Sequence, residues 1–97
     1  MGHRFEWDEA KAAGNLSKHH VSFESAARIF SDPFLLTVQD RIENGERRWQ
    51  SIGMLEGHLM LLVAHTVGVL GDASEVIRIV SARKADKKER KRYEQDR

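Results

Sequence analysis

An arginine interrupts the most strand-like segment of this chain. Arg78 stands in the middle of residues 76–80 (VIRIV), a run of β-branched residues that is otherwise typical of a strand buried on both faces. Its guanidinium cannot be neutralised, so burial requires a carboxylate or a phosphate as partner. Arg78 is therefore predicted either to bind an anionic ligand or to pair with an internal carboxylate such as Glu6, Glu24 or Asp40.

Two further arginines are candidates for the same anion site. Arg48 follows a predicted turn and shares the strand parity of Ile52, whereas its neighbour Arg47 must point to the opposite face. Arg83 comes five residues after Arg78, which places the two on opposite faces if the strand runs straight through both. This parity no longer applies if the strand ends near residue 81.

Proton transfer would fall to a histidine. His19 shares one arc of a predicted helix with Lys11 and Lys18, and histidine titrates closest to neutral pH. A histidine at a helix end can equally be a surface or capping residue. His65 lies near the end of an apolar segment, where an imidazole can also be a hydrogen-bonded core residue. The sequence leaves open which of the two would move a proton.

Several kinds of chemistry are disfavoured by what the chain lacks. It has no cysteine, which excludes disulfides, thiolate nucleophiles and zinc sites of the cysteine type. No two histidines have the helical spacing of a metal site, and no glycine-rich phosphate loop or nucleophile elbow is present. We therefore predict neither a metal nor a cofactor. Histidine, lysine and arginine alone suit the cleavage of RNA, whose own 2′-hydroxyl is the nucleophile.

The length and composition indicate one ordinary globular domain spanning residues 1–97. Of the 97 residues, 40% are hydrophobic and 32% are charged, which is not the composition of a disordered chain. The longest apolar run, residues 59–64, is too short to cross a membrane, and the first residues lack the apolar segment of a signal peptide. We expect a cytoplasmic protein without a membrane partner.

Charge is unevenly distributed along the chain. Residues 78–97 contain nine Lys and Arg against four Asp and Glu, whereas residues 35–77 contain three against six. This concentration of positive charge predicts an anionic partner at the C-terminal end. A solvated, charged helix would produce the same pattern.

The elements expected to position these residues form an α+β fold. Asp8 is a good N-cap for a helix over residues 8–20, and a second helix begins at Ser22 and ends at Asp32-Pro33. Alternating patterns and tight turns, the clearest of them Asn44-Gly45, then predict four strands over residues 35–42, 47–55, 58–67 and 75–83. The prediction is two N-terminal helices, a four-stranded antiparallel sheet with the third strand central, and a C-terminal helix.

Two details of this arrangement bear on the site. In the first helix, Ala12, Ala13 and Leu16 occupy the arc expected to face the sheet, next to the polar arc. In the helix over residues 84–95, only Ala85 and Tyr93 are available for packing. Residues 5–7 are too few to assign.

The chain resembles the BrnT family in motifs that run from about residue 5 to residue 93. The matching segments and positions, in chain order, are Phe5-Glu6-Trp7-Asp8, Lys11, Asn15, Lys18-His19, Val21, Phe23-Glu24, Arg48, Ile52-Gly53, residues 78–85 (RIVSARKA), Glu89-Arg90 and Tyr93. Because these motifs occur in the family's order over almost the whole chain, the resemblance is much more specific than a single short motif.

The resemblance implies a RelE-like fold and a ribonuclease toxin of a type II toxin–antitoxin system. It implies metal-independent endoribonuclease activity that arrests translation. It also implies neutralisation by a BrnA-like antitoxin, whose DNA-binding domain would provide the only contact with operator DNA. On this hypothesis His19 is the general acid or base, and Arg48, Arg78 and Arg83 bind the scissile phosphate. Other matched residues, namely Lys11, Lys18 and Tyr93, would bind the RNA substrate.

Two alternatives remain open from the sequence. The first is a non-catalytic module that binds protein or nucleic acid through the basic C-terminal helix. In the second, the protein cleaves RNA, but the helix over residues 84–95 contacts the antitoxin rather than the RNA. That helix has few apolar residues, so its interface would be polar and steered by charge.

Overall fold

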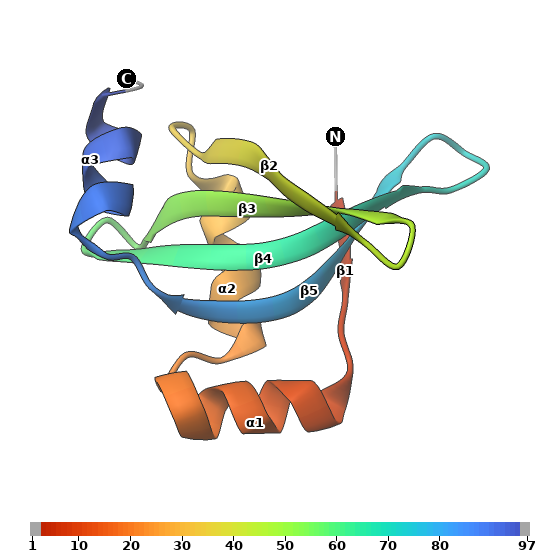
Figure 1. The fold of residues 1–97 in the computed structure, drawn as a ribbon, viewed down its shortest axis with the longest axis horizontal. Helices are drawn as coiled ribbons and strands as arrows, with labels where there is room; N and C mark the ends of the chain where they lie inside the picture. Colours follow the sequence, from red (N-terminus) through yellow and green to blue (C-terminus); the bar gives the residue numbers. More distant parts are fainter. Residues whose placement is uncertain (1–2, 96–97) are drawn as a thin grey trace.

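The computed structural model describes residues 3–95, which form one five-stranded mixed sheet with three α-helices (Figure 1). The strands lie in the order β1-β5-β4-β3-β2, so β4 is central, as predicted. In chain order the elements are β1 (His3–Glu6), α1 (Glu9–His19), α2 (Phe23–Arg28), the 3-10 turn η1 (Ile29–Ser31), β2 (Leu36–Glu43), β3 (Glu46–Leu55), β4 (Leu59–Val69), β5 (Glu75–Lys84) and α3 (Lys87–Gln95).

The expected sheet of four antiparallel strands is wrong in one respect. The short segment at the N-terminus, β1, adds a fifth strand and runs parallel to β5, with Phe5 beside Ile77 and Glu6 beside Arg78. β1 is only four residues long, and its partner lies some 70 positions further along the sequence. A pattern among neighbouring residues cannot indicate a pairing between segments so far apart in the sequence. The predicted α+β class and the antiparallel order of the other four strands are confirmed.

The predicted starts of the first two helices and the Asn44-Gly45 turn are confirmed. The helix expected over residues 84–95 begins only at Lys87, because β5 continues to Lys84. Asp8 caps α1 through a bond from the Lys11 N–H (3.1 Å), and the Ser22 hydroxyl accepts from the N–H of Ser25 (3.0 Å) at the start of α2. Asn44 and Gly45, between β2 and β3, both have positive φ, 54° and 77°. That is the combination which a two-residue hairpin turn of type I′ requires.

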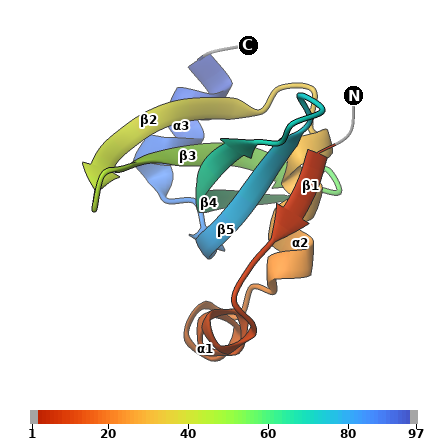
Figure 2. The same cartoon turned by 90° about the vertical axis from the view of Figure 1, so that its right-hand side faces the viewer.

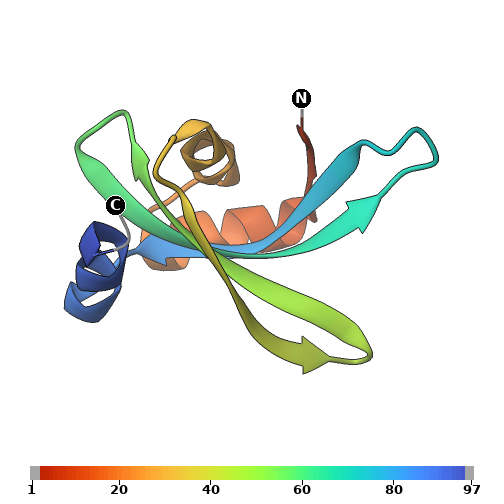
Figure 3. The same cartoon turned by 90° about the horizontal axis from the view of Figure 1, so that it is seen from above.

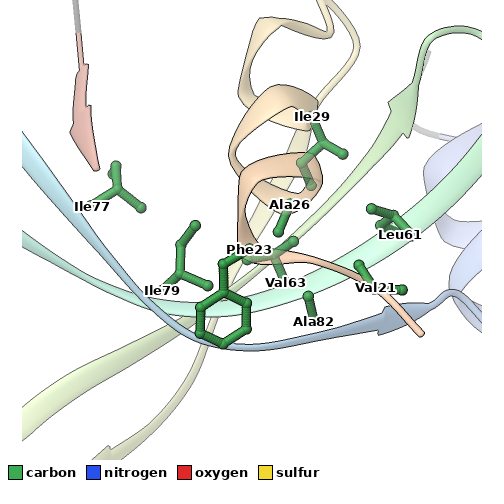
Figure 4. Packing of buried hydrophobic residues seen from close by; sticks show 9 residues of the cluster. All are labelled: Val21, Phe23, Ala26, Ile29, Leu61, Val63, Ile77, Ile79 and Ala82. Atoms are coloured by element: carbon green, nitrogen blue, oxygen red, sulfur yellow. The ribbon is translucent and has the colours of Figure 1, made fainter. Parts of the chain in front are cut away.

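One face of the sheet packs against α2 and contains the main core, and we call it the α2 face. Figure 4 shows its buried side chains, which come from α2, from the segment before it and from β4 and β5. Gly53 on β3 allows the close approach of η1, because a Cβ there would lie 3.1 Å from the Cβ of Ile29. The members of this core are Val21, Phe23, Ala26, Ile29, Leu61, Val63, Ile77, Ile79 and Ala82.

The opposite face, which we call the α3 face, packs against α3, and α3 lies across the sheet from α2 (Figure 2). Ala85 and Tyr93, the two packing residues predicted for this segment, are both buried here against Ile52, Met60 and Leu62. α3 covers one end of this surface only, as the view from above shows (Figure 3). We call the part that α3 leaves uncovered the open face.

α1 lies along the edge of β5, where β1 no longer pairs with it. The amide of Asn15 replaces a neighbouring strand: its Nδ2 donates to the Ala82 carbonyl (2.9 Å) and its Oδ1 accepts from the Ala82 N–H (3.1 Å). Asn15 is therefore the buried residue of α1, whereas Ala13 is exposed and Leu16 is 50% exposed. The side of α1 predicted to face the sheet is therefore wrong by a rotation of about one residue. The polar side chain of Asn15, rather than Ala13 or Leu16, attaches the helix to β5.

Candidate functional site

A row of polar side chains crosses the open face from β1 to β3. Strand pairing sets Glu6 beside Arg78 and Arg78 beside Thr66. Arg48 precedes Trp49, which pairs with His65, so its side chain emerges on the same face as that of Thr66. Four strands thus bring together two arginines, a threonine and a carboxylate from segments far apart in the sequence.

The first ion pair of this row lies at the surface. Arg78 Nη1 donates to Glu6 Oε2 at 3.0 Å, and the two side chains are 45% and 53% exposed. Pairs of such exposure contribute about 0–1 kcal/mol to folding. Arg78 is therefore not inside a strand buried on both faces, as the apolar run around it predicted. Glu6 is one of the three carboxylates that the sequence offered as partners of Arg78. The pair nevertheless leaves the guanidinium accessible.

Arg48 has no hydrogen-bonding partner for its Nε within residues 3–95, although this atom is buried. Leaving a buried donor unpaired is unfavourable by about 1–3 kcal/mol, more for a charged group. The half-buried side chain of Arg48 therefore has donor capacity that no described protein group uses, on the face that it shares with Arg78.

Lys11 belongs to the same charged surface. Asn15 faces the edge of β5, and at about 100° per residue Lys11 and Lys18 lie on one flank of α1, with Ala12 and His19 on the other. Ala12 packs against the core of the α2 face. Lys11 and Lys18 therefore lie on the side of the open face, and both are exposed.

Electrostatic effects on two carboxyl groups agree with this placement. The Lys11 N–H lowers the pKa of Asp8, and the charges of Lys11 and Arg78 lower it further. A hydrogen bond from Arg41 lowers the pKa of Glu43, and the charges of Arg48 and Lys11 add to this effect. The three cations from α1, β3 and β5 thus act on the carboxylates that border the same surface.

A β-bulge puts Arg83 on the same face as Arg78. Ile79 pairs with His65 but Ser81 pairs with Ala64, so Val80 is an extra residue in β5. The expectation for a straight strand, opposite faces, does not apply. Arg83 is nevertheless occupied: its guanidinium donates two bonds of 2.8 Å each to the carboxylate of Glu89 on α3. This bidentate bond raises the pKa of Arg83 and lowers that of Glu89.

The structure does not bring the histidines to this row. His19 is half-buried on the Ala12 flank of α1. His65 lies on the α2 face, is 1% exposed, and its Nε2 is 2.7 Å from the hydroxyl of Ser51. Burial lowers the pKa of His65, which favours a neutral imidazole. His65 is the hydrogen-bonded core residue that the sequence left as one alternative.

Tyr93 is buried and holds α3 in place. The ring is 2% exposed, and its hydroxyl donates to Asp32 Oδ2 at 2.6 Å. Asp32 Oδ2 further accepts from the N–H of Met54 (2.8 Å). Tyr93 thus fastens α3 to the segment after α2 and to β3, at the covered end of the α3 face.

The sequence did not single out two residues of the row as site candidates. Thr66 is 5% exposed. The alternation of side chains along β4 could have placed Thr66 on the same face as Ala64, and hence on the face of Arg78. Glu46 at the start of β3 lines a groove of about 250 Å³ together with Glu6, Thr66 and Arg78. Nothing local indicates that Glu46 belongs beside β1, because the two meet only across the twisted sheet.

Two negative observations apply to residues 3–95. No three of their His, Cys, Asp and Glu side chains gather in a way that could hold a metal ion. None of the helices among them has the length and apolar character needed to span a membrane.

Comparison with known proteins identifies a family and a similar solved structure. A family model described as the ribonuclease toxin BrnT of type II toxin–antitoxin systems matches residues 7–89. The crystal structure of the Brucella abortus ribonuclease toxin BrnT matches with a TM-score of 0.58 and 20% sequence identity, over 90% of this chain and 100% of that chain. At this identity the structural match shows the fold alone. No curated protein matches the chain.

Proposed function

The chain belongs to the BrnT family of ribonuclease toxins of type II toxin–antitoxin systems, and we propose that it cleaves RNA on the open face of its sheet. The observation that carries this location is Arg48, whose buried Nε has no protein partner and whose side chain shares a face with Arg78. Guanidinium groups bind phosphate oxygens in a fixed geometry.

The proposed reaction uses the 2′-hydroxyl of the RNA as nucleophile. Arg48 and Arg78 bind the scissile phosphate and stabilise the negative charge that builds up on its oxygens in the transition state. Lys11 and, further along the same flank of α1, Lys18 bind flanking phosphates. On this proposal the arginines supply the positive charge and cleavage needs no metal ion. We also propose that the fold is RelE-like, as the family resemblance implies.

His19 fits this site less well than the sequence suggested. Its flank of α1 faces the core of the α2 face rather than the arginine row. Arg83, with its guanidinium bound to Glu89, and Tyr93, with its hydroxyl bound to Asp32, are better explained as positioning residues that hold α3. We therefore assign phosphate binding to Arg48, Arg78, Lys11 and Lys18.

The direct test is incubation of the purified protein with RNA, with and without a chelator. We expect cleavage at the same rate in both. Arg48→Ala should lower the rate by about 10²–10³-fold. Arg47→Ala is the matched control, because Arg47 is the adjacent residue of β3 and points to the other face.

Three results would contradict the proposal. Equal losses in Arg47→Ala and Arg48→Ala would show that the open face is not the site. Chelator-sensitive cleavage would refute the metal-free reaction. The absence of cleavage under both conditions would favour the alternative, a binding module without catalytic activity.

We further propose that cleavage arrests translation and that a BrnA-like antitoxin with a DNA-binding domain neutralises it. In this proposal the antitoxin covers the open face and reaches α3, whose outward side carries Lys88, Lys91 and Arg92. An acidic antitoxin segment would complement those charges. Inducing the toxin with and without the antitoxin gene and following growth tests the neutralisation.

The contribution of α3 needs a separate experiment. Truncation after Arg83 would also remove Tyr93 and Glu89, and so would destabilise the domain. Lys88→Glu with Lys91→Glu changes charge alone. We expect weaker antitoxin binding and unchanged RNA cleavage; lower cleavage with unchanged antitoxin binding would instead make α3 an RNA contact.

A further inference from the structure

The open face contains a carboxylate to which neither the sequence nor the phosphate-binding proposal gives a role in the reaction. Glu6, the last residue of β1, lies beside Arg78 in the groove that Thr66 and Glu46 also line. Its Oε2 accepts a hydrogen bond from Arg78, and Oε1 has no bonding partner within residues 3–95. With 53% of its side chain exposed, Glu6 is accessible to a ligand bound over Arg78 and Arg48.

We propose that Glu6 is the general base of the cleavage reaction; this inference rests on the proposed function. A 2′-hydroxyl next to a phosphate held by Arg78 lies within reach of a carboxylate that is itself bonded to Arg78. Arg78 then has two tasks on different N–H groups: it orients the base and binds the phosphate. A hydrogen bond from a third group is a common means of orienting a catalytic base.

The other carboxylates around the open face are bonded to groups that do not belong to the proposed phosphate site. Asp8 Oδ1 caps α1 by accepting from the N–H of Lys11. Glu43 binds Arg41 at 2.9 Å. Glu89 is held in the bidentate bond with Arg83. Glu46 is the remaining competitor, since it lines the same groove as Glu6, but no arginine bond orients it among the described residues.

In the proposed reaction the 2′-oxygen attacks the adjacent phosphorus. Glu6 takes the proton of the 2′-hydroxyl while the 2′-oxygen forms a bond to phosphorus. The bond between phosphorus and the 5′-oxygen breaks, and solvent water gives a proton to that oxygen. The products are a 2′,3′-cyclic phosphate and a 5′-hydroxyl. Glu6 then returns its proton to water.

Three glutamate-to-glutamine variants test the assignment. Glu6→Gln keeps an oxygen that can accept from Arg78 but cannot take up a proton at neutral pH. Glu75→Gln is the matched control, because Glu75 is a half-exposed glutamate paired with His3 on the α2 face. Glu46→Gln tests the competitor. For each variant we would measure the single-turnover cleavage rate, the Kd for RNA carrying a 2′-O-methyl group, which cannot react, and the thermal unfolding midpoint.

We expect Glu6→Gln to lower the cleavage rate by about 10²–10⁴-fold, the usual contribution of a general base, with unchanged Kd and unfolding midpoint. Glu75→Gln should cleave at the rate of the unsubstituted protein, and Glu46→Gln, which changes the lining of the same groove, should lose far less than Glu6→Gln. Wild-type rates in Glu6→Gln, a loss confined to Glu46→Gln, or a loss of binding instead of rate would overturn the assignment. These outcomes can be told apart from a failure of the proposed function, because in that case the unsubstituted protein itself would not cleave RNA.

Discussion

An arginine of β5 meets a glutamate at both ends of the α3 face, but the two pairs differ in geometry and burial. At the covered end, Arg83 donates two bonds to Glu89, and the glutamate is only 15% exposed. At the open end, Arg78 donates a single bond to Glu6, which is 53% exposed. The first pair joins α3 to the sheet, and the second joins two strands that already pair through their backbones.

The difference shows why residue type alone does not identify a site. At the covered end the polar groups satisfy one another: Tyr93 donates to Asp32, and Glu89 also accepts from the N–H of Asp86. At the open end, Arg48 Nε is buried without a partner. This unsatisfied donor and the accessible charge of Arg78 support the proposal that a ligand binds at the open end, whereas the covered end contributes stability.

The largest expected effect tests the structural role of the covered end. Tyr93→Ala removes a buried ring and its bond to Asp32, and we expect a loss of about 3–5 kcal/mol in the free energy of unfolding. Chemical denaturation measures it. RNA cleavage per folded molecule should stay the same. Tyr93→Phe, which keeps the ring, should lose much less stability; a specific loss of cleavage in this variant would mean that Tyr93 contacts the substrate.

Next comes a substitution at the open end, where the opposite pattern is expected. Arg78→Ala should lower the rate of RNA cleavage by about 10²–10³-fold and abolish growth arrest, because a cation at the phosphate is lost. The free energy of unfolding should change by less than about 1 kcal/mol, since the pair with Glu6 is half-exposed. Unfolding of the Arg78→Ala domain would show that the residue is structural and that the two ends do not differ as described.

Arg83→Ala should produce a smaller effect, and on stability rather than on cleavage. It leaves the largely buried carboxylate of Glu89 without its partner, and we expect a loss of about 1–3 kcal/mol. Arg83→Lys should not restore it fully, because an ammonium group cannot form the bidentate bond. Denaturation and single-turnover cleavage are measured on the same samples. A cleavage defect as large as that of Arg78→Ala would extend the catalytic site to Arg83.

Local signals in the sequence accounted for most elements of the fold. The N-caps Asp8 and Ser22, the Asn44-Gly45 turn and the central position of β4 depend on neighbouring residues, and all were predicted. The parallel strand β1 was missed because its pairing is distant in sequence and only four residues long.

The relation between site residues was harder to predict. Parity correctly put Arg48 on the face of Ile52. For Arg78 and Arg83 parity would hold only in a straight strand, and the bulge at Val80 inserts a residue that fits an ordinary strand equally well. For α1, the helical repeat grouped Lys11 and Lys18 with His19. The bonds of Asn15 to Ala82 divide this group between two sides of the helix.

The smallest effect expected concerns the pH dependence of the covered end. The bond from Arg83 lowers the pKa of Glu89, so the folded protein holds the charged carboxylate more strongly than the unfolded chain does. This contribution is complete above the pKa of an unfolded glutamate, about 4.3, and is lost as the pH falls through the lower pKa of the folded state. We therefore expect the difference in unfolding free energy between the unsubstituted protein and Glu89→Gln to shrink below about pH 4.3. Denaturation curves between neutral and acidic pH measure it. A difference that stays constant across this range would mean that the charge of Glu89 does not hold α3, and the contrast between the two arginine–glutamate pairs would then rest on geometry alone.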